Sequence, residues 1–141
     1  MIYLIDTDVF TLAHRARHGL RDRIATERAT NEVVISLVTR IEVLRGRFDA
    51  VLKATDGAAL ARALDGLRSS EAYLAEFRVL PFDVTAVAEF ERLREDKQAK
   101  KAGRNDLLIA CTALAHGATL VTRNVKDFQN IPNLKIENWA D

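Results

Sequence analysis

The sequence lacks the features that stabilise small secreted proteins or anchor a chain in a membrane. It has one cysteine, Cys111, in 141 residues, so it cannot form an intramolecular disulfide. No apolar run approaches the ~20 residues that a membrane-spanning helix requires. The net charge is only +1, so any contact with nucleic acid must come from a local patch rather than from bulk positive charge. These absences predict a cytoplasmic protein that contacts no membrane.

What remains is the composition of an ordinary globular protein, with 48% hydrophobic and 29% charged residues. The length predicts one domain, residues 1–141. Short apolar runs predict strands, and they alternate with segments of helical periodicity, which indicates an α/β fold with a parallel sheet. These runs lie at residues 2–5, 33–36, 78–81, 118–122 and 134–136.

The most informative helix is predicted over residues 107–115, where nearly every residue is apolar or small. Such a helix is buried on all sides, and Gly117 is expected to end it. Asp106 lies in the first turn, either as an acid that interacts with the helix dipole or as part of a site. Beyond the strand that follows, the segment RNVKD is interpreted as a polar loop that contains Asn124 and Asp127.

Further acids lie close to the ends of the first two strands. Asp6 comes directly after the first strand, at the carboxyl end where open α/β sheets bind their ligands. Asp8 is either the N-cap of the next helix, expected at residues 9–16, or a second acid of the site. Ser36 ends the second strand and is predicted to cap a helix that carries Glu42. A lone glutamate on a helix is usually solvated, but Glu42 lies within two turns of a strand end.

The other helices have periodicity but no visible chemistry. Residues 47–77 are interpreted as a helical hairpin that packs or dimerises. The helix after the second strand is predicted to bury Leu37, Val38, Ile41 and Leu44. A later helix, capped by Asp83, is predicted to bury Val87, Phe90 and Leu93.

Two clusters of basic residues are candidates for contact with phosphate groups. The first, from Arg15 to Arg28, is interpreted as a solvated face, with a phosphate-binding rim as the alternative. The second leads directly into Asp106 and is the better candidate for binding a phosphate backbone, against the alternative of a solvated helix end. It comprises Lys97, Lys100, Lys101 and Arg104.

Four dispersed acids form the candidate site, namely Asp6, Glu42, Asp106 and Asp127. If they converge, their mutual repulsion requires a cation between them. Carboxylate oxygens suit Mg²⁺ or Mn²⁺ rather than zinc, and such a site can activate a water for phosphodiester hydrolysis. The three histidines show no metal-ligand spacing and are poor rivals. The acids therefore predict a magnesium-dependent reaction on phosphate.

Three segments, taken in order, resemble the PIN-domain nucleases and among them the VapC toxins of bacterial and archaeal type II toxin–antitoxin pairs. They are LIDTDVF with Asp6, SLVTRIEVLRG with Glu42, and NDLLIACTALAHGATLVTRNVKDF with Asp106 and Asp127. The resemblance covers essentially the whole chain and implies a PIN-like three-layer α/β/α sandwich with a short parallel sheet. It also implies a Mg²⁺-dependent endoribonuclease that forms a homodimer. A cognate VapB-like antitoxin would insert a basic segment into the acidic site, and DNA would be contacted only through that antitoxin.

The resemblance further implies a role for each acid. Asp6 and Asp106 would be the primary metal ligands, and Glu42 and Asp127 would complete the site directly or through waters. Water would attack phosphorus in line and leave 5′-phosphate and 3′-hydroxyl ends on the RNA.

Several polar neighbours of the acids are expected to support the site. Thr7 or Ser36 would hold a carboxylate or a water by hydrogen bonding. The chain departs from the family at Asp8, where Asn or Ser is common, and this adds a negative charge. It also has Asn124 where many PIN domains have Asp. Asp127 is then the expected fourth acid, Asn124 a neutral ligand or water positioner, and a second metal ion is left open.

Two other functions remain alternatives. LIDTDVF also resembles the opening motif of haloacid-dehalogenase-type phosphatases, with Asp6 as nucleophile and Asp8 as acid. Against this reading, no acidic pair follows a late strand, and Glu42 and Asp106 would have no role. The second alternative is a catalytically silent PIN-like binding module, against which the presence of all four acids argues.

Overall fold

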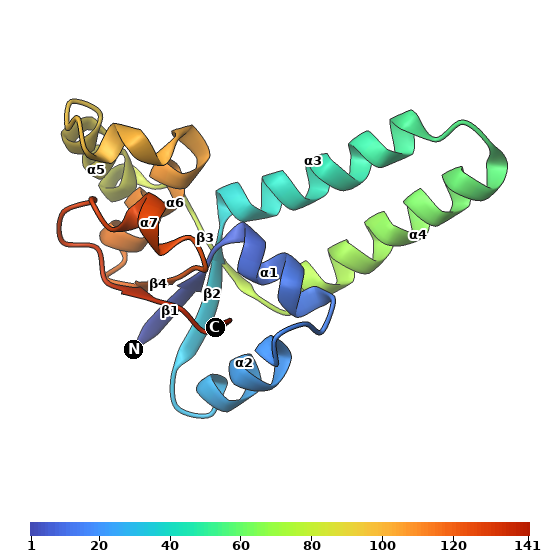
Figure 1. Cartoon of the computed structure of the whole chain (residues 1–141), viewed down its shortest axis with the longest axis horizontal. Coiled ribbons are helices and arrows are strands. Elements are labelled where there is room, and N and C mark those ends of the chain that lie inside the picture. Colours follow the sequence, from blue (N-terminus) through green and yellow to red (C-terminus); the bar gives the residue numbers. More distant parts are fainter.

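The structure, a computed structural model, describes all 141 residues and is built on a five-stranded parallel sheet (Figure 1). The strands are β1 (Ile2–Ile5), β2 (Glu32–Ser36), β3 (Arg78–Leu80), β4 (Thr119–Val121) and β5 (Ile136–Glu137). Their order across the sheet is β3-β2-β1-β4-β5. The predicted α/β class and parallel sheet are confirmed. The last strand begins at Ile136, two residues later than predicted.

Helices connect the parallel strands, because a parallel pair cannot be joined by a tight turn. They are α1 (Thr7–His14), α2 (Leu20–Arg28), α3 (Leu37–Lys53), α4 (Gly57–Leu74), α5 (Val84–Leu93), the short 3₁₀ helix η1 (Ala99–Ala102), α6 (Arg104–Ala115) and α7 (Val125–Phe128). None of these helices has both the length and the apolar character to span a membrane.

The hydrophobic core has two parts because successive residues of a strand point to opposite faces of the sheet. Tyr3 and Ile5 of β1 pack on the face covered by α1, α2 and the end of α4. Leu4, between them, packs on the other face, against α5, α6 and α7. Cys111 of α6 is fully buried on that second face, as predicted. The three-layer α/β/α sandwich is therefore confirmed.

Helices α3 and α4 form the predicted hairpin, which projects beyond the sheet (Figure 1). The predicted burial of Ile41 is wrong, because this side chain lies on a side of α3 that no other element covers and is 53% exposed. The predicted burial of Val87 on α5 is wrong for the same reason, since that side chain is 47% exposed. The sequence pattern identified both helices, but it did not show how much of each helix is covered by other elements.

Two helix starts also differ from the prediction. The N-cap of α1 is Asp6 rather than Asp8, because Asp6 Oδ1 accepts a hydrogen bond from the Val9 backbone N–H at 2.8 Å. The segment after Asn124 is the short helix α7 rather than a polar loop. Phe128 at the end of α7 is fully buried, and its burial draws this segment onto the core.

Candidate active site

The direction in which the chain adds strands reverses between β1 and β4. From β1 it adds β2 and β3 on one side, and it then crosses to the other side of β1 for β4 and β5. Connections that leave two neighbouring strands in opposite directions open a crevice at the carboxyl ends of those strands. Ile5 pairs in register with Val121, so Asp6 and Thr122, which follow them, lie side by side at this crevice. Thr122 Oγ1 donates a hydrogen bond of 2.6 Å to Asp6 Oδ2.

Asp6 is the most firmly held acid of this crevice. It is only 4% exposed, and both of its oxygens accept hydrogen bonds, one from Val9 N–H and one from Thr122. The pKa of Asp6 is raised to about 6, first by burial and then by Asp8 and Glu42, whereas the two hydrogen bonds act in the opposite direction. The fold thus keeps a carboxylate where its charge is disfavoured, which is common at functional sites.

Glu42 is oriented by a chain of hydroxyl groups that connects α3 with α1. Ser36 Oγ, at the N-cap of α3, donates to Thr39 Oγ1 at 3.2 Å. Thr39 Oγ1 lies 3.0 Å from Thr7 Oγ1, which donates to Glu42 Oε1 at 2.6 Å. Each hydroxyl has a single hydrogen, so donation to the carboxylate fixes the direction of the whole chain. Asn105 of α6 donates to the other oxygen, Glu42 Oε2, at 2.9 Å.

Asp106 shows that the acids converge. Its pKa is raised to about 6, first by burial and then by Asp6, Asp127, Glu42 and Asp8, in that order of influence. Repulsion between charges falls with distance, so these four acids lie near enough to Asp106 to influence it. Glu42, Asp6 and Asp8 accept hydrogen bonds from protein side chains, whereas no protein donor reaches Asp106 or Asp127.

Asp8 and Asn124, the two positions at which the chain departs from the family pattern, are in contact. The side-chain amide of Asn124 donates to Asp8 Oδ2 at 3.1 Å. The backbone N–H of Asn124 donates to Thr122 Oγ1 at 3.0 Å. One loop therefore supports both Asp8 and, through Thr122, the carboxylate of Asp6.

The residues of this cleft fit a hard divalent cation. Their donor atoms are mainly carboxylate oxygens, the ligands that Mg²⁺ and Mn²⁺ prefer. The raised pKa values of Asp6 and Asp106 indicate negative charge that no side chain balances and that a cation would balance. No three acidic, histidine or cysteine side chains are grouped closely enough to hold a metal ion. Because Mg²⁺ keeps several waters, the cleft suits an ion that contacts one or two carboxylates and reaches the others through water.

The predicted cationic run lies beside the cleft but touches none of its acids. Lys97, Lys100 and Lys101 are exposed, and the guanidinium of Arg104 lies over the Phe90 ring at 5.1 Å from its centroid. An open pocket of about 380 Å³ is lined by residues 102–106 and so joins Arg104 to Asp106. Arg104 thus borders the α6 side of the cleft, whereas the three lysines do not line this pocket.

Asn105 and Thr122 were not predicted as residues of the site, and Thr39 was given no role there although it belongs to the segment that resembles the family. Each left a signal in the sequence. Thr122 follows β4 as Asp6 follows β1, Asn105 directly precedes Asp106, and Thr39 lies three residues after the N-cap Ser36. These neutral side chains orient the charged ones.

Comparison with known proteins gives a consistent set of relatives. Residues 3–134 match the family model described as the PIN domain. The sequence is 30% identical to Ribonuclease VapC2 of Rickettsia felis, over 99% of this chain and 98% of that protein. It is 25% identical to the tRNA(fMet)-specific endonuclease VapC of Salmonella typhimurium, over 98% of both.

Solved structures are similar over the same length. The fold is similar to that of a chain in the crystal structure of VapBC2 from Rickettsia felis bound to a promoter DNA fragment. The TM-score is 0.81, with 28% identity over 99% of each chain. A chain of the DNA-bound VapBC from Salmonella typhimurium gives a TM-score of 0.74, with 27% identity over 99% of this chain and 98% of that one.

Proposed function

Because the chain belongs to the PIN domain family and, within it, to the VapC ribonucleases, we propose that it is the toxin of a type II toxin–antitoxin pair and hydrolyses RNA phosphodiester bonds. The observation that supports this proposal is that Asp6, Asp127, Glu42 and Asp8 all raise the pKa of Asp106 near the carboxyl edge of the sheet. An acidic cleft of this kind repels a phosphate unless a cation lies between them, so substrate and cation are expected to bind together.

Nucleases of this family generally use divalent metal ions, and we assign Mg²⁺, with Mn²⁺ as a substitute. Asp6 and Asp106 would hold the ion directly, and Glu42 and Asp127 directly or through waters. When bound, the ion supplies a nucleophile from water at neutral pH and offsets the charge that develops on the phosphate.

Residues of the chain itself orient the carboxylates of the site. Thr122 and the Val9 N–H hold the two oxygens of Asp6, and Thr7 and Asn105 hold those of Glu42. These carboxylates need no rearrangement before the reaction, which is the advantage of a preorganised site. Hydrolysis in this arrangement gives 5′-phosphate and 3′-hydroxyl ends.

The same reasoning supports a set of partners. The structures of the Rickettsia felis and Salmonella typhimurium relatives are complexes named VapBC, and a VapB-like antitoxin is accordingly proposed for this chain. A basic segment of the antitoxin would enter the acidic cleft and block it. We further propose that the toxin is a cytoplasmic homodimer that contacts DNA only through the antitoxin.

RNA cleavage by the purified protein tests the proposal. Cleavage of end-labelled tRNA is expected to stop in excess EDTA and to resume when Mg²⁺ or Mn²⁺ is added, and Glu42→Gln should be nearly inactive. Cleavage that persists in EDTA would contradict the metal dependence. Turnover of p-nitrophenyl phosphate by wild type and Glu42→Gln alike would instead favour the phosphatase. Metal binding by calorimetry without RNA cleavage would favour a silent binding module.

A further inference from the structure

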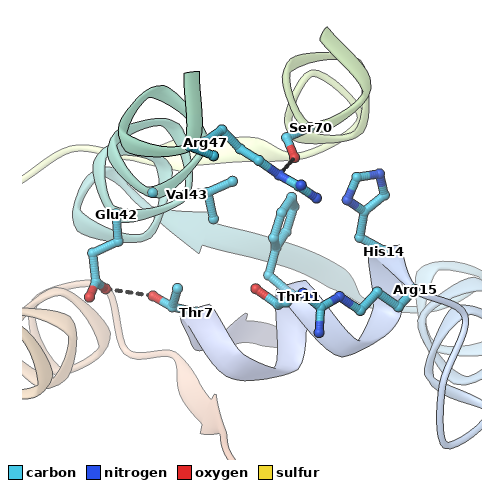
Figure 2. Close-up of a pocket in the computed structure, with 11 residues that line it drawn as sticks. Thr7, Thr11, His14, Arg15, Glu42, Val43, Arg47 and Ser70 are labelled. Carbon is cyan, nitrogen blue, oxygen red and sulfur yellow. Dashed lines mark hydrogen bonds between the residues drawn. The ribbon is translucent and has the colours of Figure 1, made fainter. Parts of the chain in front are cut away.

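A second pocket opens beside the acidic cleft, between α1, α3 and α4. Its volume is about 280 Å³. Figure 2 shows its two ends, with Glu42 and Thr7 at one and Arg47, His14 and Arg15 at the other. The pocket thus runs from an acid of the cleft to a group of basic side chains, which we call the cationic end.

Arg47 of α3 is held in place at the cationic end. Its Nε donates a hydrogen bond of 2.8 Å to Ser70 Oγ on α4, and Ser70 is only 1% exposed (Figure 2). Gly66 makes room for the guanidinium, because a Cβ at that position would lie 2.9 Å from Arg47 Nη1. No carboxylate pairs with Arg47, and its four remaining N–H groups have no protein acceptor.

The surroundings of Arg47 are mainly basic, with Glu42 at the other end of the pocket and Glu76 as the acid that acts on His14. Arg15 also lines the pocket and forms no ion pair. The pKa of His14 is lowered, first by burial and then by Arg47, Arg21 and Arg15. His14 is therefore neutral near pH 7, and it stacks on Tyr73 with ring centroids 5.0 Å apart.

Other arginines of the basic region from Arg15 to Arg28 are used by the fold itself. Arg21 donates to two backbone carbonyls at the end of α1, and its guanidinium lies over Tyr73. Arg23 pairs with Glu27, and Arg28 donates to a backbone carbonyl. Such contacts leave these groups little capacity for a ligand. Arg15 and Arg47 are the arginines that line the pocket, and both have donors without a protein acceptor.

We propose that Arg47 and Arg15 bind a phosphodiester group of single-stranded RNA within about three nucleotides of the one that is cleaved. This inference rests on the ribonuclease function proposed above. With a rise of ~1.5 Å per residue, α1 separates Thr7 from Arg15 by roughly 12 Å. A stacked strand advances ~3.4 Å per nucleotide, so this distance corresponds to up to about three nucleotides and to fewer in an extended strand.

Charge distinguishes RNA from the antitoxin as the occupant. RNA offers one anionic group after another, and it can place one phosphate at the acidic cleft with its cation and a neighbouring one at the cationic end. A basic antitoxin segment matches the cleft but is repelled by unpaired guanidinium groups. The fixed planar donors of Arg47 also match two oxygens of one phosphate, which a flexible lysine would not do as well.

Binding of a ten-nucleotide RNA, measured across salt concentrations in an Asp106→Asn background that prevents cleavage, tests the proposal. Arg47→Gln is expected to weaken binding about tenfold, as for loss of a hydrogen bond to a charged group, and to reduce the salt slope by roughly 0.7. Arg47→Lys should restore most of the slope but only part of the affinity. Arg45→Gln, an exposed arginine two residues away on α3, is the matched control and should change neither value.

A chemical variant of the RNA sharpens the test. Replacing one phosphodiester at a time by a neutral methylphosphonate should weaken binding to the wild-type pocket at a particular linkage, and Arg47→Gln should abolish that difference. Unchanged RNA affinity and slope in Arg47→Gln would overturn the inference, all the more if antitoxin binding were weakened instead. Wild-type cleavage of RNA in the same experiment would leave the proposed function standing, whereas its absence would overturn both.

Discussion

The two sides of the acidic cleft are built differently. On the β1/β4 side, Asp6 is buried and both its oxygens accept hydrogen bonds. On the α6/α7 side, Asp106 is half-buried, Asp127 is exposed, and neither accepts a hydrogen bond from the protein. The fold therefore holds Asp6, and Glu42 beside it, in fixed positions and leaves the facing acids on the adjustable side without protein hydrogen bonds. Because no three acids are grouped tightly enough to hold an ion, a cation would contact one or two carboxylates and reach the others through water.

This difference predicts unequal losses of activity when the acids are neutralised. Asp6→Asn keeps the shape of a fixed side chain and removes its charge, and we expect RNA cleavage to fall about a hundredfold or more, as for groups that act as a unit. Asp127→Asn should cost roughly tenfold, because a water can take the place of an exposed, adjustable ligand. Initial rates at saturating Mg²⁺ provide the measurement. Asp49→Asn, an exposed acid on α3, is the control, and equal losses at Asp6 and Asp127 would contradict the comparison.

The fixed acid should also destabilise the metal-free fold. The pKa of Asp6 is raised to about 6 from 3.8, so its ionised form opposes folding at neutral pH, and stability returns as the pH falls through 6. The difference between the two pKa values corresponds to a loss of about 3 kcal/mol in the free energy of unfolding at neutral pH. About 1 kcal/mol of this loss is recovered when the pH falls to 5. Asp6→Asn should therefore stabilise the protein by about 2 kcal/mol at pH 7.5, after the loss of about one hydrogen bond.

Urea unfolding in EDTA at pH 5 and pH 7.5 measures this effect. Protonation of Asp6 should make the wild type more stable at pH 5 than at pH 7.5. The dependence of stability on pH should be smaller in Asp6→Asn. Addition of Mg²⁺ at pH 7.5 should stabilise wild type more than Asp6→Asn, because binding to the folded state shifts the equilibrium by mass action. If Asp6→Asn lowered the stability at pH 7.5, Asp6 would act as a structural N-cap of α1 rather than as an acid whose burial destabilises the fold.

The sequence was sufficient for the features that depend on local patterns. Strand ends placed Asp6 correctly, because a short apolar run before an acid is a signal contained in consecutive residues. The buried helix α6, its end at Gly117 and the presence of Asp106 in its first turn follow from the same kind of pattern. The parallel sheet followed from the alternation of strands with helices.

Features that depend on contacts between distant segments could not be predicted from the sequence. The bond between Thr122 and Asp6 joins residues 116 positions apart, and the hydroxyl chain from Ser36 to Glu42 passes through Thr7 on another helix. Exposure of Ile41 could not be inferred either, since an apolar helix face looks alike in sequence whether or not another element covers it.

The hydroxyl of Thr122 holds the acid of the fixed side and can be removed by one substitution, which also removes the acceptor of the Asn124 backbone N–H. Thr122→Val keeps the shape and deletes the hydroxyl, which leaves Asp6 Oδ2 without its partner at a cost of about 1–3 kcal/mol. The hydrogen bond from Thr122 holds down the pKa of Asp6, so its loss should move the acid limb of the pH–rate profile to higher pH. Activity at neutral pH should fall up to about tenfold.

The matched control lies on the same strand. Thr119 of β4 is also buried, but its hydroxyl is not bonded to an acid, so Thr119→Val should leave the pH–rate profile in place. Urea unfolding of both variants separates lost stability from lost activity. A similar shift of the profile in both variants would show that the strand, rather than the bond to Asp6, sets the titration.

The smallest expected effect concerns the cationic run that borders the adjustable side. Lys97, Lys100 and Lys101 are exposed and form no ion pairs, so they are free to contact phosphates near Asp106. Changing all three to Gln should weaken binding to RNAs of every sequence alike and flatten the salt dependence by roughly 0.7 per lost contact, the single-strand counterion value.

Metal affinity should be nearly unchanged in the triple variant, because none of these lysines carries an oxygen ligand. A binding titration across salt concentrations in the Asp106→Asn background measures the slope, with Lys53→Gln at the far end of α3 as the control. The cationic end at Arg47 offers a fixed side chain, whereas this run offers flexible ammonium groups, so each lysine is expected to contribute less affinity than Arg47 but a similar slope. An unchanged slope in the triple variant would assign the run to solvent, and the phosphate contacts of the substrate would then lie on the α1/α3 side of the cleft alone.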